Sequence, residues 1–94
     1  MANYVISIPD DMKDISMTMS DTLTIKFSGA SNFCFDDSGG CFDKFPDAGP
    51  HHSGDPDVPM TPVAVGESAY NAVTSGDCRP RGPAATGHTI TVTN

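Results

Sequence analysis

Apolar and polar residues alternate with a period of two along the first third of the chain. The apolar positions of three such runs are Tyr4, Ile6 and Ile8; Ile15, Met17 and Met19; and Leu23, Ile25 and Phe27. Alternation of this kind buries one face of a sheet and leaves the other in water. The pattern therefore predicts three strands whose apolar positions fill a common core.

Similar patterns return after a turn around Gly29 and again in the last third. Their apolar positions are Phe33 and Phe35; Val63 and Val65, which lead into Gly66; Tyr70, Ala72 and Val73; and Ile90 and Val92. No segment has the composition of a helix. About seven half-apolar strands predict an all-β Greek-key sandwich of two packed antiparallel sheets, immunoglobulin-like, in one domain over 1–94.

The stretch 36–60 lacks this periodicity and is rich in Asp, Gly and Pro. This composition predicts one long acidic loop, which Phe42 and Phe45 would attach to the sandwich by packing against it. Loops of this length in a small domain are often functional.

Charge excludes several classes of partner. Twelve acidic residues against five basic ones give a net charge of −7 and a pI near 4.4, so no basic face exists for nucleic acid or an anionic bilayer. No apolar run approaches the roughly 20 residues that cross a membrane. The first residues, MANYVISIPDDM, do not form a signal peptide. This indicates a cytoplasmic protein if the chain is complete, and a periplasmic or extracellular one if it is a mature fragment.

An enzyme is not expected. No serine lies in G-x-S-x-G, and three histidines offer few bases. The sequence favours a non-catalytic structural or binding module that acts through its loops or strand edges, because loops on a rigid sandwich are where binding usually resides. Protein binding or self-association is expected rather than binding of a small molecule, and no cofactor is expected.

Two stretches resemble the cupredoxin family. In ISMTMSDTLTIKFSGAS the matching residues are Ser20, Asp21, Thr22, Leu23, Thr24, Ile25 and Phe27. In the tail they are Tyr70, Cys78, Gly87, Ile90 and Val92. Together the two stretches cover about half of the chain, and the resemblance implies a cupredoxin-like sandwich of the small bacterial type that lacks the full copper site. A blue-copper site uses two His, one Cys and often a Met, whereas neither His nor Met lies between Cys78 and His88. With cysteines in both ligand loops, the resemblance implies a Cys34–Cys78 disulfide in place of copper.

Other states of the three cysteines stay open. Cys34 and Cys41 flank a Gly-Gly turn and could close a hairpin disulfide, and a reducing cytosol would keep all three as thiols. The alternative function is a copper- or zinc-binding cupredoxin relative. Its candidate ligands are Cys34 or Cys41, Cys78, His51, His52 and His88.

The acidic loop itself offers two further metal hypotheses. His51 and His52 are adjacent and have no standard ligand spacing, which favours a solvated loop over a zinc or copper site. The aspartates at 36, 37, 43, 47, 55 and 57 do not have EF-hand spacing, which favours a solubilising role over calcium.

Overall fold

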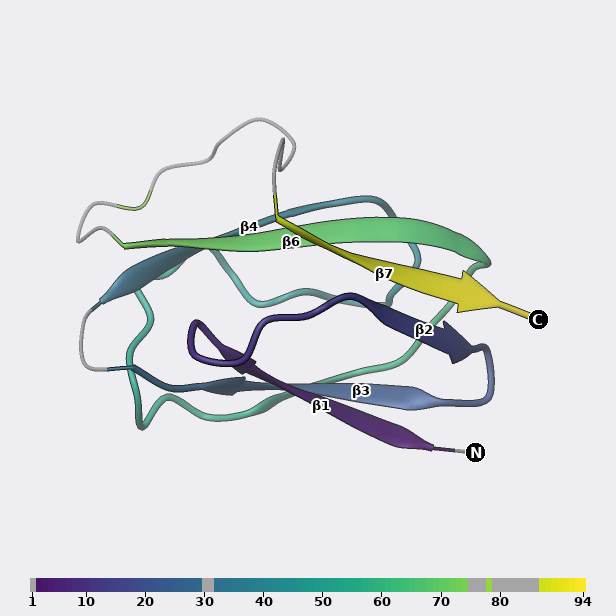
Figure 1. Cartoon of the computed structure of the whole chain (residues 1–94), viewed down its shortest axis with the longest axis horizontal. Helices are drawn as coiled ribbons and strands as arrows, with labels where there is room; N and C mark the ends of the chain where they lie inside the picture. The colour runs from purple at the N-terminus through teal and green to yellow at the C-terminus, as the bar shows by residue number, and fades with distance from the viewer. Residues whose placement is uncertain (1, 30–31, 75–77, 79–86) are drawn as a thin grey trace.

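Every regular element that the structure describes is a β-strand. The computed structural model describes residues 2–29, 32–74, 78 and 87–94. The strands are β1 (Asn3–Ile8), β2 (Ile15–Thr18), β3 (Thr22–Phe27), β4 (Phe33–Ser38), β5 (Val58–Met60), β6 (Gly66–Thr74) and β7 (His88–Thr93). They form a three-stranded sheet, β1-β3-β5, and a four-stranded sheet, β2-β7-β6-β4, which lie as two layers (Figure 1). The described residues contain no helix that could span a membrane.

The predicted all-β class is confirmed, but the expected antiparallel pairing holds only in part. β1 runs parallel to β3, and β2 runs parallel to β7. The reason is the route of the chain: it leaves β1, crosses to the other sheet as β2, and returns as β3. Two reversals separate β1 from β3, so these two strands point the same way, whereas β5 pairs with β3 antiparallel.

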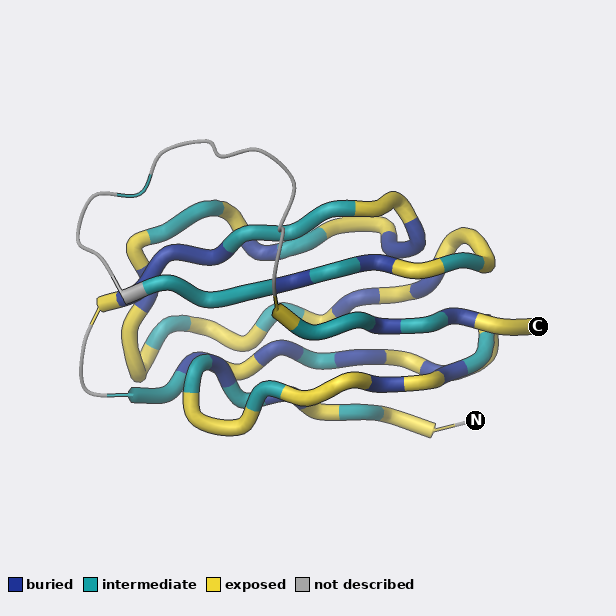
Figure 2. Tube along the Cα trace, turned by 45° about the horizontal axis from the view of Figure 1, so that its top comes forward, coloured by how far each residue is buried: buried dark blue, intermediate teal, exposed yellow. Residues whose placement is uncertain are grey.

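The alternating positions fill the space between the sheets, as the pattern predicts. The most completely buried large apolar side chains from both sheets are Tyr70, Phe33, Ile6, Ile8, Leu23, Ile25, Met60, Ile90 and Val92. Figure 2 shows buried and exposed residues alternating along the strands. Each buried aliphatic or aromatic side chain contributes about 1.5–3 kcal/mol by leaving water, so this layer supplies most of the stabilising free energy.

Tyr70 also holds a connection between the sheets. Its hydroxyl donates to the carbonyl oxygen of Lys13 at 2.6 Å and accepts from the amide N–H of Lys13 at 2.9 Å. Burial raises the pKa of the phenol. The chain between β1 and β2 is thereby fixed to β6.

Three expectations about boundaries need correction. The loop predicted over 36–60 is shorter, because β4 continues to Ser38 by pairing with β6 and β5 begins at Val58. Val63 and Val65 precede β6 and are 55% and 52% exposed. Met19 is 37% exposed because β2 ends one residue earlier, at a turn that Asp21 closes. Local alternation shows which face a residue would take, but not whether a partner strand reaches it.

The two ends of the sandwich differ. One end carries the β2–β3 turn and both chain termini (Figure 1). At the other end β3 finishes, β4 begins, and the segment 47–57 passes before β5. We call this second end the loop end.

Candidate functional site

The backbone of the acidic loop covers the free edge of β4. The amide of Phe33 donates to the carbonyl of His51 at 3.0 Å, and the amide of His51 donates back to Phe33 at 2.9 Å. Phe35 donates to the carbonyl of Ala48 at 3.0 Å. Gly49 permits this approach because it has a φ of +103° and a Cβ there would lie 3.1 Å from the Phe33 carbonyl. The loop is therefore part of the sheet edge at this point.

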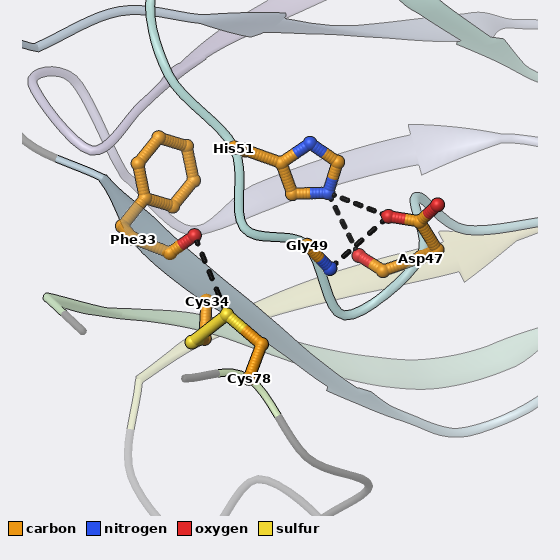
Figure 3. The surroundings of a disulfide bond; sticks show 6 residues. All are labelled: Phe33, Cys34, Asp47, Gly49, His51 and Cys78. Atoms are coloured by element: carbon orange, nitrogen blue, oxygen red, sulfur yellow. Dashed lines mark hydrogen bonds and ion pairs between the residues drawn. A yellow bond between two sulfur atoms is a disulfide. The ribbon is translucent and has the colours of Figure 1, made fainter. Parts of the chain in front are cut away.

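The His51 imidazole anchors the loop from inside. The residue is only 8% exposed, and its ring stacks on Phe27 with centroids 4.3 Å apart and planes 5° apart. Nδ1 lies 3.0 Å from Asp55 Oδ2, and Nε2 lies 2.8 Å from the Asp47 carbonyl oxygen and 3.0 Å from Asp47 Oδ1. Figure 3 shows the ring facing Asp47, with Gly49 between them in the chain. His51 thus joins both arms of the loop to the end of β3.

The contacts within the loop also set the pKa of Asp55. Burial acts to raise the pKa of Asp55, but the hydrogen bonds from the His51 ring and the His52 amide outweigh it and hold this pKa below its ordinary value. An ionised carboxylate and a carbonyl oxygen can only accept hydrogen bonds. Both ring nitrogens of His51 therefore make their polar contacts within the loop, to Asp55 and to Asp47.

A disulfide holds Cys78, in the connection between β6 and β7, beside Phe33 at the loop end. The sulfur atoms of Cys34 and Cys78 are joined at 1.96 Å, and their Cα atoms lie 5.3 Å apart. Cys78 Sγ is 3.9 Å from the carbonyl oxygen of Phe33, the residue that pairs with His51 (Figure 3). Of the pairings that the sequence allowed, this is the one implied by the cupredoxin resemblance. Cys41 is a buried thiol elsewhere, so the hairpin pairing with Cys34 does not form.

A cavity of about 430 Å³ opens beside the stacked rings of His51 and Phe27. Its wall includes Phe27 and His51, three prolines (Pro46, Pro50 and Pro56), and Val58. The cavity therefore lies between the end of β3 and the segment 46–58.

The predicted metal ligands do not converge in the described part of the chain, where no group of three or more His, Cys, Asp or Glu is arranged to hold a metal. His52 is exposed and contacts Asp55 at 3.2 Å. His88 begins β7, with Nδ1 3.4 Å from Asp14 Oδ1. The six aspartates of the calcium hypothesis are spread over separate contacts: two lie on β4, two bind His51, and the others contact Thr61 and Lys26.

The solvated-loop interpretation is correct for His52 and wrong for His51. Adjacent histidines give no local signal for this difference. The nearest hint in the sequence is the spacing of aspartates four residues before and after His51, which can meet both nitrogens of one ring. The stacking partner Phe27 could not be inferred, because it reaches His51 only through the pairing of β4 with the loop. The Pro/Gly/Arg stretch after Cys78 falls mostly outside the described residues.

Comparison with known proteins gives a fold and no family. No family model matches the sequence, and no curated protein matches it. Among solved structures, the chain is similar to the cysteine protease inhibitor EhICP2 from Entamoeba histolytica, with a TM-score of 0.56 and 11% identity. The alignment covers 99% of this chain and 97% of that one. At this identity the likeness shows a shared all-β arrangement of strands across the whole chain, and it leaves the cupredoxin resemblance a prediction.

Proposed function

We propose that this chain is a non-catalytic module that binds a protein partner with its loop end. The observation that carries the proposal is the convergence at Phe33. Its backbone pairs with His51, its carbonyl lies against Cys78, and the disulfide fixes the neighbouring Cys34. Three connections far apart in sequence are thus anchored side by side on a rigid pair of sheets, an arrangement that supports recognition by preorganised loops.

The chemistry of this end favours binding over catalysis. Both ring nitrogens of the buried histidine are occupied by acceptors of its own loop. The cysteines nearest to it form a disulfide, so they offer no thiolate nucleophile. The neighbour with the similar fold is an inhibitor rather than an enzyme, which fits the same interpretation.

A cysteine protease is the partner class to test first. The only support for this class is the likeness to EhICP2, and a shared fold by itself does not determine function. The Greek-key and cupredoxin-like assignments, and the copper- or zinc-binding alternative, stay predictions. That alternative would need the Cys34–Cys78 bond to open before either sulfur could act as a thiolate ligand.

The experiment measures inhibition of a panel of cysteine proteases that have been activated and then freed of thiol reductant, so that the disulfide is preserved. We expect the unmodified chain to inhibit at least one member stoichiometrically. Ser53→Arg at the exposed tip of the loop should weaken inhibition at least tenfold. Met19→Arg, the matched control at the opposite end, should leave it unchanged.

Two results would count against the proposal. If Ser53→Arg inhibits as strongly as Met19→Arg, the loop end is not the binding surface. If the chain inhibits no member of the panel and does not bind the same proteases by surface plasmon resonance, cysteine proteases are excluded as its partner class.

A further inference from the structure

The cavity at the loop end combines apolar walls with carboxylates. Its apolar residues come from the end of β3 and from the segment that leads into β5: Phe27, Pro46, Pro50, Pro56 and Val58. Asp47, Asp55 and Asp57 belong to the same lining. A volume of about 430 Å³ lies at the lower end of the range for ligand sites, so it suits one side chain rather than a folded segment.

The wall of the cavity is held in place by contacts with both sheets. The ring of His51 stacks on Phe27 of β3, and its backbone pairs with Phe33 of β4. The three prolines of the lining restrict the backbone further, because the pyrrolidine ring fixes φ. A ligand that enters the cavity therefore loses little free energy to ordering of the loop.

The carboxylates of the lining keep acceptor capacity for a ligand. Asp47 uses Oδ1 for its contacts with the His51 ring at 3.0 Å and the Gly49 amide at 3.1 Å, and Figure 3 shows its second oxygen directed away from both. Asp57 contacts Lys26 Nζ through Oδ2 at 3.4 Å. An ionised carboxylate has two acceptor oxygens with about four lone-pair positions, so both residues can accept further hydrogen bonds.

The lining carries a negative charge. Its three carboxylates are accompanied by the ammonium group of Lys26, so three negative charges and one positive charge leave −2 when the imidazoles of His51 and His52 are neutral. Protonation of either imidazole reduces this negative charge by one unit. The net charge of −7 on the whole chain also attracts a cation.

An arginine side chain matches both the charge and the walls of the cavity. Its guanidinium is always charged, is weakly hydrated, stacks on aromatic faces and donates paired hydrogen bonds to carboxylates. A lysine ammonium is more strongly hydrated and loses more on contact with apolar walls. A metal ion prefers oxygen ligands on all sides, and the described residues hold no group arranged for one. We propose that the cavity receives an arginine side chain of the protein partner, an inference that rests on the proposed function.

The first test measures binding of a small probe, N-acetyl-arginine-N-methylamide, by heteronuclear NMR at about pH 7.5, where an ordinary imidazole is mostly neutral. We expect saturable shifts of the amides of Gly49, His51 and Val58, with a Kd on the order of 1 mM. The citrulline analogue has the same shape without the charge and should bind at least fivefold more weakly. Equal binding of the two probes, or no saturable shift with the arginine probe up to about 50 mM, overturns the proposal.

Two ion pairs of similar geometry provide the variants and their controls. Asp57→Asn removes a carboxylate from the lining and should raise the Kd of the arginine probe about threefold. Lys26→Gln removes the competing ammonium group and should lower this Kd about threefold. Asp11→Asn and Lys13→Gln alter an exposed pair with the same 3.4 Å separation outside the lining, so they should leave the Kd unchanged. Equal effects from the two pairs would show that overall charge attracts the probe, and would overturn the proposal.

The protease panel separates this inference from the proposed function. Inhibition that Asp57→Asn weakens at least threefold, and that Asp11→Asn leaves unchanged, supports both. Inhibition that Ser53→Arg weakens but Asp57→Asn does not overturns the arginine site and keeps the loop end as the binding surface. Binding of the arginine probe, with no protease bound or inhibited, keeps the arginine site and excludes cysteine proteases as the partner class.

Discussion

The side chain of His51 holds the acidic loop in place at the loop end. Its ring combines a parallel stack on Phe27 with contacts to Asp47 and Asp55, so it connects β3 with both arms of the loop. Its neighbour His52 shares the contact with Asp55 but lies in solvent. The sequence presents the two histidines as equivalent. Only tertiary pairing makes one of them a structural anchor, so reasoning from the sequence could name both residues but could not separate them.

The two histidines should respond differently to alanine. His51→Ala removes a buried stack and leaves Asp55 without its ring partner, so we expect a loss of about 2–3 kcal/mol in the free energy of unfolding. His52→Ala should change it by less than about 0.5 kcal/mol. Urea denaturation followed by circular dichroism measures both. Equal losses for the two variants would mean that His51 is not the anchor.

Asp21 should make the fold sensitive to acid. Its carboxylate accepts from the backbone N–H groups of Thr18 at 2.9 Å and Ala2 at 2.8 Å, and these bonds lower its pKa from the ordinary 3.8. Above pH 4 the ionised form stabilises the fold. As the pH falls toward the lowered pKa, the unfolded chain binds the proton first, so stability is lost. Asp55, whose pKa is also lowered, acts in the same direction.

The measurement is the urea midpoint between pH 6 and pH 2 for the parent and for Asp21→Asn. The variant should be less stable at pH 6, and its midpoint should fall less steeply below pH 4. An acid profile identical to that of the parent would contradict the role of this carboxylate.

At the scale of the elements, period-two alternation predicts where most strands lie but not how they pair. β1, β3 and β7 fall where the pattern places them, because Ile, Leu, Phe and Val occupy their buried positions at every second residue. β5 was missed since a strand of three residues with a central Pro59 has no periodicity to detect. The parallel neighbours were missed because they depend on β2 crossing to the other sheet, which is a non-local choice.

The close approach of β4 to β6 should depend on Gly39. It follows β4 with a φ of +96°, and a Cβ there would lie 2.7 Å from the Glu67 carbonyl oxygen and 2.9 Å from Ser68 Cα. Gly39→Ala should therefore cost about 3 kcal/mol or more in unfolding free energy, from strain and backbone clash together.

Two glycines of the same chain serve as controls. Gly54 has a φ of +99° but open space around it, so Gly54→Ala should show the strain alone, about 1 kcal/mol. Gly40 has neither positive φ nor a near neighbour, so Gly40→Ala should be neutral or slightly stabilising. A loss at Gly39 no larger than at Gly54 would rule out the close contact.

For the whole molecule, the disulfide compensates for a small core. The chain has one Leu, five Ile, six Val and five Phe, so large apolar side chains are scarce for a domain of 94 residues. The Cys34–Cys78 bond spans 44 residues and ties the β6–β7 connection to the start of β4. By the chain-entropy relation, a closed loop of this length lowers the entropy of the unfolded state by the equivalent of about 4 kcal/mol.

Cys34→Ser and Cys78→Ser should each lose up to about 4 kcal/mol of unfolding free energy, and the double variant should lose no more than either single one. Cys41→Ala, at the buried thiol, is the control for removing a cysteine without breaking the bond. Denaturation with and without a thiol reductant measures these values. Additive losses in the double variant would contradict a shared bond.

Peptide mapping of the unreduced protein tests most directly whether distant connections are joined at one end of the sandwich. The structure predicts a linked pair of peptides that contain Cys34 and Cys78, with Cys41 recovered as a free thiol. A link between Cys34 and Cys41, or three free thiols in protein purified without reductant, would contradict it. Either result would leave the β6–β7 connection untied from Phe33 and the loop end without its common anchor.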